Sequence, residues 1–230
     1  MAIVQLEAIK KSYQLGVTTV PALNGVDLAL DHGEFTVVMG PSGSGKTTLL
    51  NIIGCLDRAD SGRYILDGED VSGRDFDDLA DIRNRKIGFI FQSFNLVPVL
   101  DVVENIEFPC VIRSNPEPAK QLRARALKVA EEVGLAPFLK HRPDELSGGQ
   151  RQRVAIARAL VTEPRLVLAD EPTANLDSKT SEQILDLMQR LNREQGVTFL
   201  FSTHDPRVSS RATRVVHIAD GVLSAPATAA

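Results

Sequence analysis

Short apolar segments recur along the chain and are separated by stretches with a helical pattern. Four of these segments have four to six residues and are rich in Val, Leu, Ile and Phe: "FTVVM" (35–39), "IGFIF" (87–91), "LVLA" (166–169) and "VTFLFS" (197–202). Runs of this kind, bounded by glycine or charged residues, are typical of parallel strands that are buried on both faces. Between residues 178 and 196, apolar residues repeat on one helical face, and Gly196 suits the helix end. The pattern predicts an α/β fold with a parallel sheet as its core.

Two regions depart from this rhythm. Residues 1–30 alternate between apolar and polar positions, and together with residues 60–70 they predict an antiparallel β subdomain at the edge. Residues 93–150 carry six prolines around one clear helical pattern and predict a mostly helical insert. We therefore expect a single domain over residues 1–221, followed by a disordered tail at 222–230 that contains "SAPATAA".

Composition narrows the class of protein. The 230 residues carry a formal net charge of -4 and no basic stripe, which argues against nucleic acid as a partner. Cys55 and Cys110 lack the spacing of a metal site and are expected to be reduced, buried thiols. No apolar run approaches the ~18 residues of a membrane span, and the N-terminus does not resemble a signal peptide. We expect a cytoplasmic protein, and work at a membrane would need another polypeptide to supply the spans.

The segment "GPSGSGKTT" (40–48) follows an apolar strand and opens a helical stretch. The phosphate-loop pattern G-x-x-x-x-G-K-[ST] is matched by Gly40, Gly45, Lys46 and Thr47. Glycines let backbone N–H groups approach phosphate oxygens, and a helix N-terminus adds positive potential. Lys46 would neutralise the β- and γ-phosphates of ATP, while the Thr47 hydroxyl would ligate Mg²⁺. The predicted ATP-binding residues of this loop are Gly40, Ser42, Gly43, Ser44, Gly45, Lys46, Thr47 and Thr48.

Two adjacent carboxylates, Asp170 and Glu171, follow the apolar run at 166–169. Open α/β sheets bind their ligands at the carboxyl ends of strands, so both acids are expected at a ligand site. Asp170 would hold the magnesium ion through water. Glu171 would lie on the far side of the γ-phosphate, where a general base polarises the attacking water.

A second glycine-rich segment, "DELSGGQRQRVAIARAL" (144–160), also opens a long helical pattern. Together with "GPSGSGKTT", "LVLADEP" (166–172) and "STHD" (202–205), it makes the chain resemble the nucleotide-binding subunits of ABC transporters over residues 3–221. This resemblance implies a P-loop NTPase (RecA-like) core with an N-terminal antiparallel β subdomain and a helical subdomain insert. Within the family, the chain is most similar to the group of lipoprotein-release and macrolide-exporter ATPases.

The resemblance also implies roles for individual residues. Tyr13 matches the aromatic residue that stacks on adenine, and Gln92 matches the glutamine that senses magnesium and the attacking water. Asp177 matches the loop that communicates between subunits, and His204 matches the histidine that contacts the γ-phosphate. The resulting sets are Glu171, His204 and Gln92 for catalysis, and Thr47, Gln92 and Asp170 for magnesium.

In the family, two subunits pair head to tail, and the second loop of each subunit closes over ATP bound to the other. The residues expected to contact ATP in trans are Ser147, Gly148, Gly149 and Gln150. The resemblance implies a homodimer that forms on ATP binding and a separate transmembrane permease. The chain would be peripheral, on the cytoplasmic face of the inner membrane. Phe94, Leu96, Val97 and Leu100 either pack the helical insert or line a groove that receives a short permease helix, and we expect some of them to do the latter.

Other ATPases with a similar second loop fit the chain less well. DNA-repair and chromosome ATPases need a long coiled-coil insertion between the two loops, and this chain has no room for it. Translation factors of the same superfamily carry two cassettes per chain, whereas this chain has one. An ATP-dependent switch or scaffold for a membrane complex, such as a cell-division assembly, stays open, although Glu171 and His204 favour hydrolysis.

Overall fold

The structure is a computed structural model that describes residues 2–113 and 115–224. Its central sheet has six strands in the order β10-β9-β3-β8-β7-β6. These strands are β3 (Phe35–Met39), β6 (Ile87–Ile90), β7 (Leu166–Asp170), β8 (Thr198–Ser202), β9 (Arg214–Ala219) and β10 (Val222–Ser224). All neighbours pair in parallel except β9 and β10, which are antiparallel. The predicted parallel core is confirmed, and its four apolar runs form β3, β6, β7 and β8.

Burial on both faces explains why those four runs are continuously apolar. In β7, Leu166 and Leu168 belong to one hydrophobic core, whereas Val167 and Ala169 belong to a second core on the opposite face. Strand β9 escaped the sequence analysis because its burial alternates. Val216 and Ile218 are buried, while its other side chains are at least partly exposed, so no continuous apolar run marks it.

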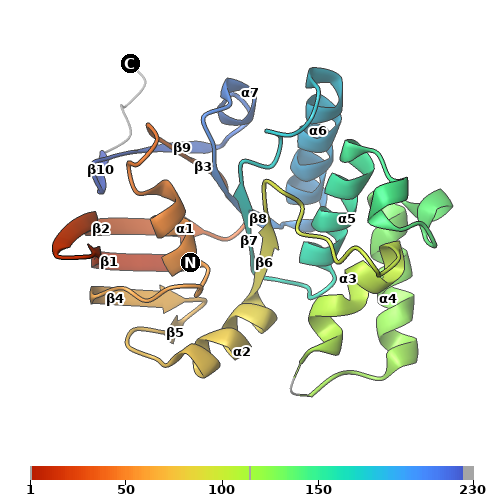
Figure 1. Ribbon diagram of the computed structural model, residues 1–230, viewed down its shortest axis with the longest axis horizontal. Helices are drawn as coiled ribbons and strands as arrows, with labels where there is room; N and C mark the ends of the chain where they lie inside the picture. The colour runs from red at the N-terminus through yellow and green to blue at the C-terminus, as the bar shows by residue number, and fades with distance from the viewer. Residues whose placement is uncertain (1, 114, 225–230) are drawn as a thin grey trace.

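A second, antiparallel sheet lies beside the central sheet, as the alternating N-terminal pattern predicted (Figure 1). Its order is β2-β1-β4-β5, with β1 (Ala2–Leu15), β2 (Thr18–Asp31), β4 (Ser61–Leu66) and β5 (Glu69–Asp70). Helix α1 (Lys46–Ile53) buries Leu49 and Ile53 in the core that this sheet shares with the central sheet. The antiparallel sheet and the central sheet therefore both pack on the helix that follows the phosphate loop.

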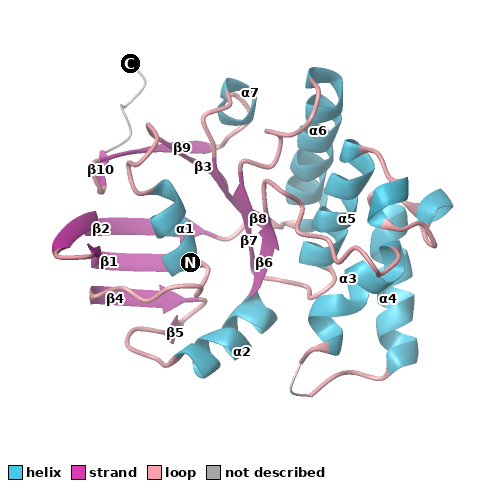
Figure 2. Cartoon of the chain, viewed as in Figure 1, coloured by secondary structure: helices cyan, strands magenta, loops and turns pink. Residues whose placement is uncertain are grey.

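The remaining helices cover the other side of the central sheet, apart from α2 and α7 (Figure 2). The helices that cover it are α3 (Val102–Val111), α4 (Ala119–Glu132), α5 (Gly148–Leu160) and α6 (Ser178–Gln195). The two others are α2 (Phe76–Lys86) and α7 (Pro206–Ser209), and short 3₁₀ turns lie at Ala136–Phe138 and Pro143–Glu145. The described residues between β6 and α5 form only helices and loops, in keeping with the predicted insert. Helix α6 ends at Gly196, whose φ of 68° is left-handed, and its buried face includes the predicted Ile184, Leu187, Met188 and Leu191.

The C-terminal region differs from the sequence prediction at its start. Residues 222–224, predicted to belong to the disordered tail, form β10 and pair with the exposed edge of β9. This pairing satisfies backbone groups that the edge would otherwise leave open. The preceding turn is anchored as well, because Gly221 N–H donates to the Ser44 carbonyl at 3.0 Å and Asn24 N–H donates to the Gly221 carbonyl at 2.8 Å. The predicted tail residues 225–230 lie outside the described part of the chain.

Within the described residues, no helix is both long and apolar enough to cross a membrane.

Candidate nucleotide-binding site

The loop between β3 and α1 can accept only glycine at two positions. A Cβ atom at Gly40 would lie 2.1 Å from the Ile218 carbonyl oxygen. Gly45 has a left-handed φ of 106°, and a Cβ atom there would lie 2.6 Å from the Ala22 carbonyl oxygen. Gly45 is also the N-cap of α1, which has no side-chain cap and no acidic residue in its first turn. The N–H groups at the start of α1 are therefore open to an anion.

Lys46 is oriented by the loop that precedes it. Its ammonium group donates to the carbonyl oxygens of Gly40 at 2.7 Å and Pro41 at 2.8 Å. Because an ammonium group has three donors, one N–H remains for a phosphate oxygen. The Ser44 hydroxyl is buried and has no hydrogen-bond partner among the residues that the structure describes. The loop thus offers the Lys46 cation and an uncapped helix N-terminus to one ligand.

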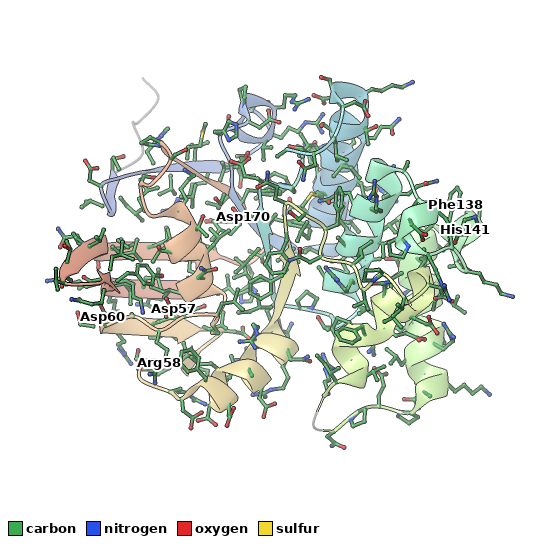
Figure 3. The ribbon with its side chains drawn as sticks, in the orientation of Figure 1. Asp57, Arg58, Asp60, Phe138, His141 and Asp170 are labelled. Carbon is green, nitrogen blue, oxygen red and sulfur yellow. The ribbon has the colours of Figure 1, made fainter. Side chains whose placement is uncertain are left out.

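The carboxylates that follow β7 lie at the same edge of the sheet as this loop, because β3, β8 and β7 are parallel neighbours. Asp170 is the last residue of β7 and lies at the centre of the molecule (Figure 3). Burial raises the pKa of Asp170, and the charge of Glu171 raises it further, whereas Ser202 and Lys46 oppose the shift. Because β3 and β7 both pair with β8, the phosphate loop and Asp170 lie at one edge of the sheet and form one candidate site.

Glu171 and His204 are brought together by the fold. Glu171 Oε1 lies 2.6 Å from His204 Nδ1, and Oε2 accepts a hydrogen bond from the Thr203 hydroxyl at 2.8 Å. The imidazole is exposed and the carboxylate is largely covered, with exposed side-chain fractions of 80% and 17%. Glu171 also has a left-handed φ of 44°, which is unusual for a residue with a side chain. Strained backbone of this kind concentrates at functional sites, where the surrounding structure must hold it.

Thr203 and Asp205 were not singled out in the sequence, although both lie within "STHD". The Thr203 hydroxyl donates to Glu171 and accepts from the Asp205 N–H at 3.0 Å. Asp205 in turn forms a salt bridge with Arg207, with an Nη2–Oδ2 distance of 2.7 Å, which is the main reason that its pKa is lowered. The whole motif is therefore a hydrogen-bonded support for the Glu171 carboxylate.

Gln92 follows β6 in an exposed loop, beside the segment that follows β7. Its carbonyl oxygen accepts a hydrogen bond from Asn175 at 2.9 Å, a contact that the sequence did not indicate. Asp177 is the N-cap of α6 and accepts from both the N–H and the hydroxyl of Thr180, at 3.0 and 2.5 Å. The Thr180 hydroxyl is also the main reason that the pKa of Asp177 is lowered. Asp177 thus has a clear local role in starting α6.

Tyr13 lies on β1 and its hydroxyl donates to Asp57 at 2.8 Å. Asp57, labelled in Figure 3, also accepts from Lys11 at 2.8 Å, and the Lys11 ammonium lies 5.3 Å from the centre of the Tyr13 ring. Burial raises the pKa of Tyr13, and the bond to Asp57 raises it further, whereas the Thr48 hydroxyl lowers it. Tyr13 thus lies near Thr48 of the phosphate-loop helix.

The second glycine-rich segment is separate from these groups. Ser147 is the N-cap of α5, and its hydroxyl accepts from Gln150 N–H at 3.3 Å while the Gln150 side chain accepts from Ser147 N–H at 2.7 Å. A Cβ atom at Gly149 would lie 2.5 Å from Thr180 Cγ2, so the start of α5 packs against the start of α6. Helices α1 and α5 lie on opposite sides of the central sheet (Figure 1). Within one chain, Ser147, Gly148, Gly149 and Gln150 do not join the loop of Lys46.

The fold and these motifs define the class of the protein. The sequence model of the ABC transporter family matches residues 23–174, more than half of the chain. The chain therefore belongs to the ABC transporter family and is an ATP-binding cassette of that family, an ATPase.

Comparison with individual proteins shows which members of the family the chain is similar to. The chain is 51% identical to the ABC transporter ATP-binding protein YknY of Bacillus subtilis, covering 95% of this chain and 94% of that protein. It is also 51% identical to the macrolide export ATP-binding/permease protein MacB of Syntrophobacter fumaroxidans, covering 97% of this chain but only 31% of that protein. Among solved structures, it is similar to the dimeric, post-hydrolysis state of the ATP-binding cassette MJ0796 bound to ADP and Pi. The TM-score is 0.87 at 44% identity, with 96% of this chain and 97% of that chain covered.

Proposed function

We propose that the chain hydrolyses Mg-ATP at two sites shared by a head-to-tail pair of identical chains, and that this cycle drives a separate membrane permease. The observation that carries the proposal is the separation of two phosphate-binding groups within one chain. Lys46 and Glu171 lie at one edge of the central sheet, whereas the start of α5 lies beyond the sheet. The dimeric structures of the similar cassette MJ0796 support the proposal that a second copy of the chain supplies its α5 start to the ATP bound by the first.

The start of α5 can drive dimer closure because it would touch ATP only when the two chains meet. Ser147 offers a hydroxyl, and Gly148 and Gly149 offer N–H groups at a helix start. Moving a two-state equilibrium from about 1:99 to about 99:1 requires ~5.5 kcal/mol of differential binding. Hydrogen bonds to charged groups contribute ~1.5–3 kcal/mol each. Two or three such bonds at each of two sites are sufficient, and loss of the γ-phosphate would reopen the dimer.

The side chains at the sheet edge fit a magnesium ion. Asp170 and Glu171 are adjacent acids at the carboxyl end of β7, and burial is the main reason that the pKa of Asp170 is raised. Oxygen ligands from the Thr47 hydroxyl, Gln92 and Asp170 are of the kind that Mg²⁺ prefers. When bound, the ion would neutralise charge on the β- and γ-phosphates. Glu171, held by Thr203 and His204, would take the proton of the attacking water, and His204 would face the γ-phosphate.

A phosphate-release assay tests this proposal against the scaffold alternative. The purified protein should release phosphate from ATP, and removal of Mg²⁺ with a chelator should stop release. Release should rise more steeply than linearly with protein concentration where the monomer predominates, because each site needs two chains. A protein that binds ATP and dimerises without releasing phosphate would contradict the proposal and support an ATP-dependent switch.

A groove of about 640 Å³ between α2, β6 and α3 is the surface that we propose for the permease. Apolar side chains line it, including Phe89, Phe91, Phe108 and Ile112. The four candidates from the sequence are not in its lining: Leu96 packs against the hydrophobic core, and Phe94 lies against Arg151. Six charged residues also line the groove without an ion pair among the described residues: Asp77, Asp78, Asp81, Arg83, Arg113 and Arg158. Apolar walls with charged side chains of both signs suit an amphipathic helix of the permease.

Ile112→Glu tests this surface. Ile112 lines the groove and is 61% exposed, so the variant should fold and keep the ATPase rate of the isolated chain. Stimulation of that rate by the membrane partner should be lost, because a charge would enter the apolar contact. Val111→Glu is the matched control, since Val111 is the neighbouring residue, is 57% exposed and does not line the groove. Equal loss in both variants, or loss of the unstimulated rate, would count against the groove.

A further inference from the structure

Arg158 of α5 holds the backbone of the loop that follows Gln92. Its guanidinium donates from Nη2 to the Phe94 carbonyl at 2.6 Å and from Nη1 to the Asn95 carbonyl at 2.5 Å. Phe94 and Asn95 have left-handed φ values of 59° and 50°. A left-handed backbone is unfavourable for a residue with a bulky side chain such as Phe94, whereas asparagine adopts it more readily. The backbone conformation that directs the two carbonyl oxygens at Arg158 therefore costs conformational free energy, which the two hydrogen bonds must offset.

Within the described part of the chain, no ion pair explains the position of the guanidinium. Burial lowers the pKa of Arg158, and no ion pair involves it among the described residues. Its planar fork matches two neighbouring carbonyl oxygens, which a lysine ammonium could not span with the same geometry. Arg151, two turns earlier on α5, lies 5.5 Å from the centre of the Phe94 ring. Two arginines of α5 thus contact this loop: Arg158 hydrogen-bonds to the two carbonyl oxygens, and Arg151 lies over the Phe94 ring.

These contacts connect three parts of the molecule. Only Ser93 separates residues 94–95 from Gln92, whose own carbonyl accepts a hydrogen bond from Asn175 in the loop before α6. Arg158 is on the helix that begins at Ser147. Arg158 and Asn95 both line the groove between α2 and α3, so an occupant of that groove would contact both residues directly. The two carbonyls, the helix and the groove therefore meet at one side chain.

We propose that Arg158, in the last turn of α5, is a positioning residue that fixes the direction of Gln92 and ties it to this helix. The inference rests on the proposed ATPase function for the role of Gln92, but the local hold on residues 94–95 does not depend on it. Groove occupancy would reach the nucleotide site by shifting the Arg158 guanidinium relative to the Phe94 and Asn95 carbonyls.

Hydrogen exchange of the purified chain tests the hold directly. In Arg158→Ala the amides of residues 93–97 should exchange at least ~10-fold faster than in the wild type, because the loop opens locally. The kcat for ATP should fall by ~10–100-fold, as expected for a misplaced catalytic group, while KM changes little because the loop of Lys46 is intact. Arg158→Lys keeps the charge without the fork and should give the same pattern more weakly.

Arg153→Ala is the matched control. Arg153 is on the same helix, is also desolvated, and donates to the Val133 carbonyl at 2.6 Å in the insert. Its loss should leave exchange at 93–97 and the kcat unchanged. Unchanged exchange at 93–97 in Arg158→Ala would overturn the inference. If Arg158→Ala is globally unstable, Arg158→Lys decides by the same local readout. Because exchange is measured without ATP, absence of hydrolysis in the wild type would defeat the proposed function and leave this result standing.

Discussion

Glu171→Gln should lower the rate of ATP hydrolysis by ~10²-fold or more while ATP binding stays intact. Glutamine has the shape of glutamate and can still accept the hydrogen bond from Thr203, so the strained backbone at φ 44° keeps its support. Its amide cannot take a proton from water, which removes the general base. Steady-state phosphate release and equilibrium nucleotide binding measure the two effects separately. The variant should also accumulate as an ATP-dependent dimer in gel filtration, because the closed state no longer decays.

Glu163→Gln provides the control for this substitution. Glu163 is also a glutamate with a left-handed φ, 53°, but it is exposed and follows the far end of α5. Its replacement should leave turnover unchanged. If Glu171→Gln retains near-normal turnover, Glu171 is not the general base, and the hydrogen bond from His204 has a structural purpose only.

Mixing two inactive variants should restore activity if the α5 start acts across the dimer. Ser147→Arg should abolish hydrolysis while ATP binding to the monomer stays near normal, because the loop of Lys46 is untouched. Lys46→Ala should instead weaken ATP binding to its own chain. A mixed dimer has one site with an intact phosphate loop from the first variant and an intact α5 start from the second. Phosphate release from the mixture should therefore exceed the sum of the two separate rates, provided that one site can turn over alone.

The structure adds a condition to this experiment. Ser147 is the N-cap of α5, so Ser147→Arg also costs about 1 kcal/mol of stability through the lost cap. Thermal melts should show this loss, and Asp144→Arg, an exposed change before the cap, should keep most of the activity. If Ser147→Arg removes ATP binding by the monomer as completely as Lys46→Ala does, the α5 start serves its own chain, and the head-to-tail dimer is excluded.

The parallel core was predictable because its strands are buried on both faces, which leaves a continuous apolar signal in the sequence. Strand β9 was not predictable, because half of its side chains face outward. Its place in the sheet also depends on parallel pairing with β3, which is distant in the sequence. The same limit applies to β10, whose short sequence becomes a strand only because β9 offers it an edge. Local pattern thus predicts elements that carry their own signal, whereas edge strands depend on a neighbour.

The site divides in the same way. The phosphate loop and Asp170 could be predicted because glycine spacing and a strand end are local features. The left-handed backbone of Glu171 and its bond from Thr203 could not, because they depend on β7 and β8 meeting at one edge. Arg158 carried no signal either, since its partners lie more than 60 residues away in the chain. Such contacts are set by tertiary packing alone.

The positions of the two tyrosines also determine what the intrinsic fluorescence of the molecule reports. The chain has two tyrosines, nine phenylalanines and no tryptophan, and phenylalanine emits only weakly, so its ultraviolet fluorescence comes mainly from Tyr13 and Tyr64. Tyr64 is buried with its hydroxyl bonded to the Ile53 carbonyl at 2.6 Å, and burial raises its pKa well above the ordinary value. Tyr13 is 37% exposed and lies beside the phosphate-loop helix. One of the two emitters is thus a native label at the proposed adenine position, and the other is a constant background.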